Sequence, residues 1–126
     1  MIIISIHIFP QELTEYIRLM ESLNDTVNHI KNINQFKILT TLNLNETLIK
    51  HDDSVSGIIN SFRTTNQNSK FGYDELITYD ENFLGVNEHR NHTIDMSATG
   101  DSIIFLDSDI HFNADILAHH ENAVSV

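Results

Sequence analysis

Apolar runs and amphipathic stretches alternate along this chain. Four runs rich in apolar and β-branched residues have the composition and length of β-strands. These runs are Ile2–Phe9, Phe36–Leu44, Leu76–Tyr79 and Ser102–Leu106. In the last run the apolar residues are consecutive, which is typical of a parallel strand buried on both faces. We therefore expect Ile103–Leu106 to lie at the centre of a sheet.

Between these runs, apolar residues recur at helical spacing. The best-defined helix follows Pro10, the only proline, which suits the first turn of a helix. Its apolar face consists of Leu13, Tyr16, Ile17, Met20, Leu23 and Val27. Further helices are expected over Val55–Arg63, from Gly85 to about Ala98 and from about Ala114 to Glu121, with a helical turn over Asn45–Lys50 and a loop over Asn66–Gly72. Gly100 is placed to act as a C-terminal cap.

This order of strands and helices predicts an α/β fold. Repeated strand–helix–strand units form parallel sheets with right-handed crossovers. We expect a Rossmann-like three-layer domain with about four mostly parallel strands, formed by residues 1–126 as a single domain.

The charge balance narrows the range of partners. The 126 residues include 7 Lys or Arg against 18 Asp or Glu, which gives a formal net charge of −11. Such a chain repels nucleic acid and anionic membranes, so neither is an expected partner. The absence of cysteine excludes disulfides, thiolate nucleophiles and cysteine-ligated zinc. The apolar run at the start lacks a basic flank and is too short to span a bilayer, so we expect a cytoplasmic protein.

The most informative chemistry is an acidic pair, Asp107 and Asp109, directly after the last apolar run. Open α/β sheets bind ligands at the carboxyl edge of their strands, where these carboxylates are expected. Two carboxylates separated by one residue can share a hard divalent cation, and ligand phosphates can complete its coordination. A bridging cation also offsets the repulsion between an acidic protein and an anionic ligand. The pair therefore indicates metal-bridged binding of a nucleotide or a sugar diphosphate.

The acidic pair belongs to a longer pattern. In order along the chain, the pattern is a glycine before a helix with Arg-Asn, then Gly-Asp, an apolar strand and Asp-x-Asp. Its members are Gly85, Arg90, Asn91, Gly100, Asp101, Asp107 and Asp109. This stretch resembles the family 2 glycosyltransferases of the GT-A fold, with an interval from Arg90 to Gly100 one residue longer than the commonest form. The resemblance implies the N-terminal, donor-binding half of an enzyme that transfers sugar from a nucleotide-diphosphate sugar to an acceptor, which stays unknown.

The resemblance also implies roles for individual residues. Asp109 would contact a Mn²⁺ or Mg²⁺ ion that bridges the donor diphosphate. Asp107 would lie near the ribose or the waters of the metal. Phe9 and Pro10 would lie against the nucleobase, and Arg90 would belong to the donor site.

The chain departs from the family pattern in three places. After the second strand the family offers an acid to the base, a role that only Glu46 can fill here. The usual Pro-x-Tyr-Asn turn after the first strand is replaced by Pro10-Gln11-Glu12, so the base stays undefined. The family takes its acceptor site and general base from sequence beyond the motif, but this chain ends seventeen residues after Asp109. We therefore expect a truncated unit with unknown catalytic residues, whose acceptor half comes from elsewhere, such as a partner chain.

Other interpretations stay open. The domain could bind a nucleotide or metal without catalysis, support a partner chain, or be a metal-dependent nucleotidyltransferase with a similar sheet and acidic pair. Asp107 and Asp109 could only end a strand and cap the next helix, since Asp suits both roles. Arg90 could be a solvated helix residue.

Several polar residues have ordinary structural explanations. Glu12 suits the first turn of a helix because it complements the helix dipole, and Asp101 suits a turn. His89 and His92 lie one helical turn apart, but two histidines without further ligands make a poor metal site. None of these four residues is expected to bind a ligand.

Overall fold

The structure is a computed structural model that describes residues 1–44, 52–79, 86–109, 117–118 and 121. Its strands are β1 (Ile2–Ile8), β2 (Phe36–Leu44), β3 (Gly72–Tyr79) and β4 (Ser102–Leu106). Its α-helices are α1 (Leu13–Asp25), α3 (Asp52–Gln67) and α4 (Val86–Met96). Three short 3-10 turns are η1 (Pro10–Glu12), η2 (Thr26–His29) and η3 (Ile33–Gln35).

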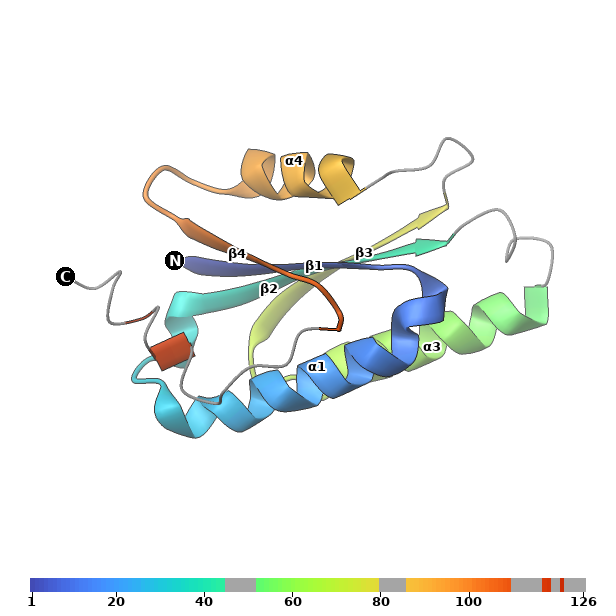
Figure 1. Cartoon of the computed structure of the whole chain (residues 1–126), viewed down its shortest axis with the longest axis horizontal. Helices are drawn as coiled ribbons and strands as arrows, with labels where there is room; N and C mark the ends of the chain where they lie inside the picture. Colours follow the sequence, from blue (N-terminus) through green and yellow to red (C-terminus); the bar gives the residue numbers. More distant parts are fainter. Residues whose placement is uncertain (45–51, 80–85, 110–116, 119–120, 122–126) are drawn as a thin grey trace.

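The four strands form one parallel sheet in the order β3-β2-β1-β4 (Figure 1). In the register of this sheet, Ile4 of β1 pairs with Ile38 of β2 and with Ile104 of β4. The chain adds β2 and β3 on one side of β1 and then returns to place β4 on the other side. The strand order therefore reverses between β1 and β4, where open sheets of this kind bind ligands.

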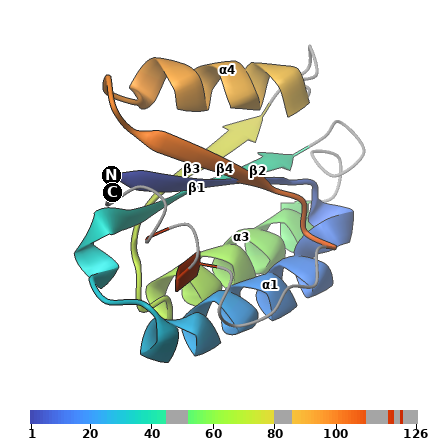
Figure 2. The same cartoon turned by 60° about the vertical axis from the view of Figure 1, so that its left-hand side comes forward.

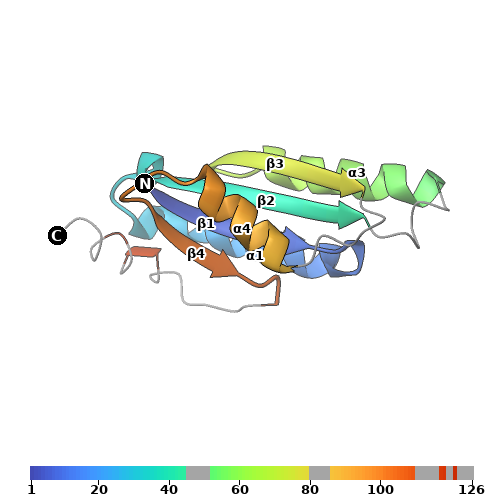
Figure 3. The same cartoon turned by 90° about the horizontal axis from the view of Figure 1, so that it is seen from above.

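Helices cover both faces of the sheet and make three layers. α1 and α3 lie on one face, and α4 lies on the opposite face (Figures 1 and 2). Seen from above, α4 runs across β1 (Figure 3). The expected Rossmann-like α/β fold with parallel strands is thus confirmed. Among the described helices, none combines the length and the apolar character that crossing a membrane requires.

The two faces of the sheet differ in polarity. The even positions of β1 are isoleucines buried in the main core, which α1 and α3 complete. The largest fully buried side chains of these two helices are Tyr16, Leu19, Met20, Leu23 and Phe62. On the face toward α4, the buried side chains include Ser5 and Thr41, and His7 is half-buried. Because strand side chains alternate between faces, β1 is apolar on the face toward α1 and α3 and largely polar on the face toward α4.

The strand before the acidic pair lies at the edge of the sheet, which corrects its expected central position. In the described sheet β4 pairs with β1 alone, whereas β1 and β2 each have two neighbours. Its side chains are only partly buried, and Phe105 is 36% exposed. A consecutive apolar run identifies a strand, but it does not state how many strands flank it or whether both faces are covered.

Several element boundaries also differ from expectation. Helix α3 and strand β3 are both longer than predicted, and Asn66 lies in α3 rather than in a loop. Within the core, the Tyr16 hydroxyl donates to Asn66 Oδ1 and accepts a hydrogen bond from Thr40 Oγ1 at 3.0 Å. This buried partner explains why a polar residue continues the helix. The turn predicted over Asn45–Lys50 lies outside the described residues.

Candidate functional site

A small cavity of about 70 Å³ lies at the carboxyl edge of the sheet, where β1 and β4 meet α4. It is lined by Ser5, His7, Phe9, Glu12, His89, Arg90, Phe105, Leu106 and Asp107. We call this cavity the edge pocket. Its lining combines carboxylates, imidazoles, aromatic rings and one guanidinium. It sits at the reversal of strand order, so topology and chemistry identify the same candidate site.

Glu12 joins the two strand ends that border the edge pocket. The Phe9 backbone N–H donates to Glu12 Oε1 at 3.0 Å, and the Ser108 hydroxyl donates to Glu12 Oε2 at 2.6 Å. One carboxylate thus holds the turn after β1 and the turn after β4, although Glu12 and Ser108 are far apart in sequence. The sequence indicated only a first-turn acid, because nothing local reveals a partner on a distant turn.

The acidic pair flanks this anchored serine. Asp107 and Asp109 are exposed, and Ser108 between them is 5% exposed. The buried side chain of Ser108 points into the protein, and the carboxylates of Asp107 and Asp109 on either side of it remain exposed to solvent. Within the described part of the chain, no three His, Cys, Asp or Glu side chains are grouped to hold a metal ion. Carboxylate oxygens are ligands that hard cations accept, but two of them would leave most of a coordination shell to other oxygens.

Arg90 is the cation of the edge pocket. Its guanidinium carbon lies 5.3 Å from the centroid of the Phe105 ring, a distance typical of a cation–π contact. The Arg90 side chain is exposed, so its donors stay accessible to an anion. Arg90 and Asp107 both line the pocket, which brings together two residues predicted from the motif.

The two residues expected against a nucleobase are placed differently. Phe9 lines the edge pocket, and its ring lies 5.0 Å from the His7 ring in an edge-on arrangement. Pro10 is buried at the start of η1 and is not among the residues that line the pocket. Glu46 and Gly85 lie outside the described residues.

His89 is the main site residue that the motif did not single out for this position. Its side chain is 6% exposed, and both ring nitrogens contact hydroxyls. Nε2 lies 2.6 Å from Ser5 Oγ, and Nδ1 lies 3.0 Å from Thr41 Oγ1. Burial, followed by the nearby His7, lowers the pKa of His89 to about 4. The imidazole is therefore neutral at pH 7.

His7 lies beside His89, with ring centroids 5.2 Å apart. Burial lowers the pKa of His7, and Glu12 opposes that shift. The His7 Nε2 atom is buried and has no hydrogen-bond partner within the described residues. Because β1 is a strand, His7 and Ser5 point to the same face, and sequence alternation alone was sufficient to place them together.

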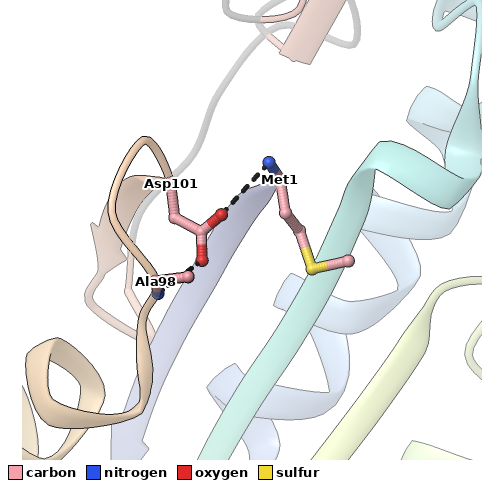
Figure 4. A network of polar contacts seen from close by, with 3 residues as sticks. All are labelled: Met1, Ala98 and Asp101. Atoms are coloured by element: carbon pink, nitrogen blue, oxygen red, sulfur yellow. Dashed lines mark hydrogen bonds and ion pairs between the residues drawn. The ribbon is translucent and has the colours of Figure 1, made fainter.

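Asp101 lies at the amino ends of β1 and β4, the end of the sheet opposite the edge pocket, and does not belong to the site. Its carboxylate accepts from the Ala98 N–H at 2.8 Å and lies 3.3 Å from the Met1 amino nitrogen (Figure 4). The hydrogen bond from Ala98, followed by the contact with the amino group, lowers the Asp101 pKa. Gly100 precedes it with φ of +94°, a conformation that favours glycine. The turn role predicted for Asp101 fits this geometry. Gly100 was expected to cap the helix, but α4 ends at Met96, so Gly100 lies in the turn that follows and does not cap the helix.

A second hollow of about 240 Å³ lies between α4 and strands β2 and β3. Its lining is largely apolar and includes Leu39, Leu76 and Met96, with His92 and Thr93 from α4. His89 lines both cavities. His92 is exposed at this hollow, and the described residues contain no group of three His, Cys, Asp or Glu side chains that could hold a metal ion there.

The chain matches no family model, no curated protein and no solved structure.

Proposed function

We propose that this domain binds a nucleotide-diphosphate sugar through a divalent cation at Asp107 and Asp109, as the donor-binding part of a glycosyltransferase. The observation that carries the proposal is the position of this exposed acidic pair. It follows β4 at the reversal of strand order, and Asp107 lines a pocket that also holds Arg90 and an aromatic ring. The motif resemblance and the topology support the same edge independently.

The charge of the chain supports a role for the cation. With a formal net charge of −11, the protein repels a diphosphate before any local contact forms. Asp107 and Asp109 are the residues that would hold Mn²⁺ or Mg²⁺, both of which accept carboxylate oxygens. When bound, such an ion would neutralise charge on the diphosphate as it departs.

The remaining side chains of the pocket have complementary roles in the proposal. Arg90 offers hydrogen-bond donors to a phosphate oxygen, and its contact with Phe105 limits the freedom of its long side chain. The Phe9 ring offers an apolar surface to a base. Glu12 holds the turn that carries the acidic pair through its hydrogen bond from Ser108. The proposal concerns donor binding and assigns no general base.

The first prediction tests this proposal with Asp109→Asn. We expect wild type to bind UDP-, GDP- or CDP-sugars in the presence of Mn²⁺, and the variant to lose most of that binding because one oxygen ligand loses its charge. Isothermal titration calorimetry with and without excess chelator measures the dependence. Asp25→Asn is the matched control, because Asp25 is also exposed and the charge change is identical.

Two outcomes would contradict the proposal. One is equal nucleotide binding by wild type in chelator and in Mn²⁺. The other is an Asp109→Asn variant that binds as tightly as Asp25→Asn. Release of pyrophosphate from a nucleoside triphosphate as a sugar 1-phosphate attacks its α-phosphorus, with formation of the nucleotide-diphosphate sugar, would instead favour a nucleotidyltransferase.

A further inference from the structure

The contact between α4 and the sheet is polar, which is unusual for a helix that covers a sheet face. Among the α4 residues whose side chains are described, 89–96, the buried ones are His89 and Thr93, at 6% and 0% exposure. The apolar residues Ile94 and Met96 are more than half exposed. Apolar burial therefore contributes little to the packing of this part of α4 on the sheet. The contact is instead made by two polar side chains that lie one helical turn apart.

The hydrogen-bond directions in this contact follow from counting protons. Thr93 Oγ1 donates its single proton to the His89 backbone oxygen at 3.0 Å. It must then accept in its 2.8 Å contact with Ser5 Oγ, so Ser5 is the donor there. Ser5 has no proton left for His89, and therefore accepts from His89 Nε2–H at 2.6 Å. In a neutral ring Nδ1 is then an acceptor, and Thr41 Oγ1 donates to it at 3.0 Å.

This arrangement specifies one tautomer and one charge state. A proton added at Nδ1 would oppose the proton that Thr41 donates, and it would place a positive charge in a site with few free acids. The charged or titratable groups around the ring are His7 on β1, Glu12 on η1, Asp74 and Glu75 on β3, Arg90 and His92 on α4, and Asp107 after β4.

These neighbours do not compensate a charged imidazole. Asp74 lies 2.6 Å from Lys37, and Glu75 lies 3.7 Å from Arg63, so both carboxylates face cations. Glu12 already accepts two hydrogen bonds, and Asp107 is exposed, so that water screens its charge. Arg90 is a positive charge on the adjacent residue. The neutral ring is therefore the form that keeps the network intact.

We propose that His89 is a positioning residue for the edge pocket: as the neutral Nε2–H tautomer it fixes α4 on β1 and β2, and so holds Arg90 over Phe105 where an anionic ligand enters. This inference deepens the proposed function and rests on it for the identity of the ligand. The placement of Arg90 by His89 is a property of the free protein, so it is testable without a ligand.

The first test is NMR spectroscopy of the full chain without ligand. Long-range ¹H–¹⁵N spectra, assigned with His89→Gln, are expected to show Nε2 protonated and Nδ1 unprotonated at pH 7. The Arg90 side-chain protons are expected to carry an upfield ring-current shift from Phe105. An Nδ1–H tautomer, or an Arg90 side chain without this shift, would overturn the inference.

The second test compares substitutions at His89 with a control one turn away. A glutamine amide has both a donor and an acceptor and stays uncharged, so His89→Gln is expected to keep the Arg90 ring-current shift. His89→Ala is expected to lose it, and the exposed control His92→Gln is expected to keep it. If His89→Ala fails to fold by circular dichroism, the wild type below pH 4 replaces it: there the shift should disappear, while His89→Gln retains it. Retention of the shift by folded His89→Ala, or by folded wild type at that pH, would contradict the inference.

The third test uses UDP, GDP and CDP with Mn²⁺ as probes. If one binds, loss of the Arg90 contact in His89→Ala is expected to weaken it about tenfold or more, as for a lost charge-assisted hydrogen bond. His89→Gln should bind like wild type at pH 7. Protonation of His89 is expected to weaken wild-type binding as the pH falls toward 4, and His89→Gln should lose less affinity over that range. If none binds wild type, the proposed function fails, whereas the tautomer and the Arg90 shift still decide the role of His89. Equal affinity of His89→Ala and wild type would refute the positioning role.

Discussion

Glu12 shows how a single side chain can join distant parts of the site. Its two carboxylate oxygens accept hydrogen bonds from the turn after β1 and from the serine between the two aspartates. The pair of bonds fixes the turn that carries Asp107 and Asp109. A residue of this kind affects both stability and ligand binding, although it need not touch the ligand.

Substitution of Glu12 by glutamine is expected to destabilise the fold by about 1–3 kcal/mol, because an amide cannot accept both hydrogen bonds with its two heteroatoms. It should also weaken Mn²⁺-dependent nucleotide binding. Glu15→Gln is the control, since Glu15 is an exposed acid in the first turn of α1. Urea denaturation measures the difference. Equal unfolding free energies for the two variants would show that the Glu12 contacts contribute nothing.

The buried histidines predict how stability depends on pH. The pKa of His89 is about 4 in the folded chain and near 6.5 when unfolded, so the unfolded state binds more protons between these values. The contribution of neutral His89 to the free energy of unfolding is therefore fully present above pH 6.5. It is lost as the pH drops toward 4, which lowers the free energy of unfolding by on the order of 3 kcal/mol. The lowered pKa of His7 acts in the same direction.

Urea denaturation at half-unit pH intervals measures this decline. His89→Gln should flatten most of it, and His29→Gln should leave it unchanged, because His29 is exposed and is not among the groups that lower the His89 pKa. The lowered pKa of Asp101 adds a loss of stability only below its ordinary value of 3.8, so its effect falls outside this window. A pH profile of His89→Gln that is parallel to wild type between pH 6.5 and 4 would contradict the assignment.

The sheet packs against its helices through two different interfaces, one apolar and one polar. Strands β1 and β2 carry the core against α1 and α3, where the isoleucines of β1 meet Tyr16 and Phe62. Strand β4 completes the sheet at its edge, and α4 lies over β1 through hydroxyl and imidazole contacts. The apolar face provides stability, and the polar face borders the candidate site.

This division predicts unequal costs for the same substitution on paired strands. Ile4 and Ile104 are register partners on β1 and β4, and Ile4 is fully buried whereas Ile104 is only partly buried. Ile4→Ala is expected to cost about 2–5 kcal/mol, the range for emptying a buried aliphatic site. Ile104→Ala should cost clearly less. Equal costs in urea denaturation would place β4 in the interior, as its apolar sequence first indicated.

For the chain as a whole, the dominant electrostatic property is its negative charge. A formal net charge of −11 opposes compaction through self-repulsion, which salt screens. The ion pairs Lys37–Asp74 and Arg63–Glu75 would weaken with salt, but exposed pairs of this kind contribute about 0–1 kcal/mol each. Relief of the global repulsion is therefore expected to exceed the loss of local attraction.

The melting temperature is accordingly expected to rise by roughly 2–5 °C as NaCl increases from about 10 to 150 mM. Over this range the Debye length falls from about 30 Å to about 8 Å. Differential scanning calorimetry with NaCl and KCl at equal ionic strength separates screening from specific ion binding. A melting temperature that falls with either salt would mean that local ion pairs outweigh the net charge.

Much of the architecture was readable from residue patterns. The bounds of β2 matched the predicted Phe36–Leu44, and α1 followed Pro10 and its turn as expected, because periodicity and proline geometry are local properties. The motif singled out both Asp107 and Arg90, and both line the edge pocket. The neighbours of each strand were harder to predict, because hydrophobicity indicates that a strand is buried but does not indicate which strand pairs with it.

The tertiary structure decided the features that depend on contacts between distant residues. It placed β4 at an edge, gave Glu12 its partner on the turn at Ser108, and brought His89 onto Ser5 and Thr41. Helical and strand periods identify which side chains share a face, and they fixed the α/β class. They carry no information about which faces meet. That choice follows from packing across the whole sheet, and here it created a polar interface beside the proposed ligand site.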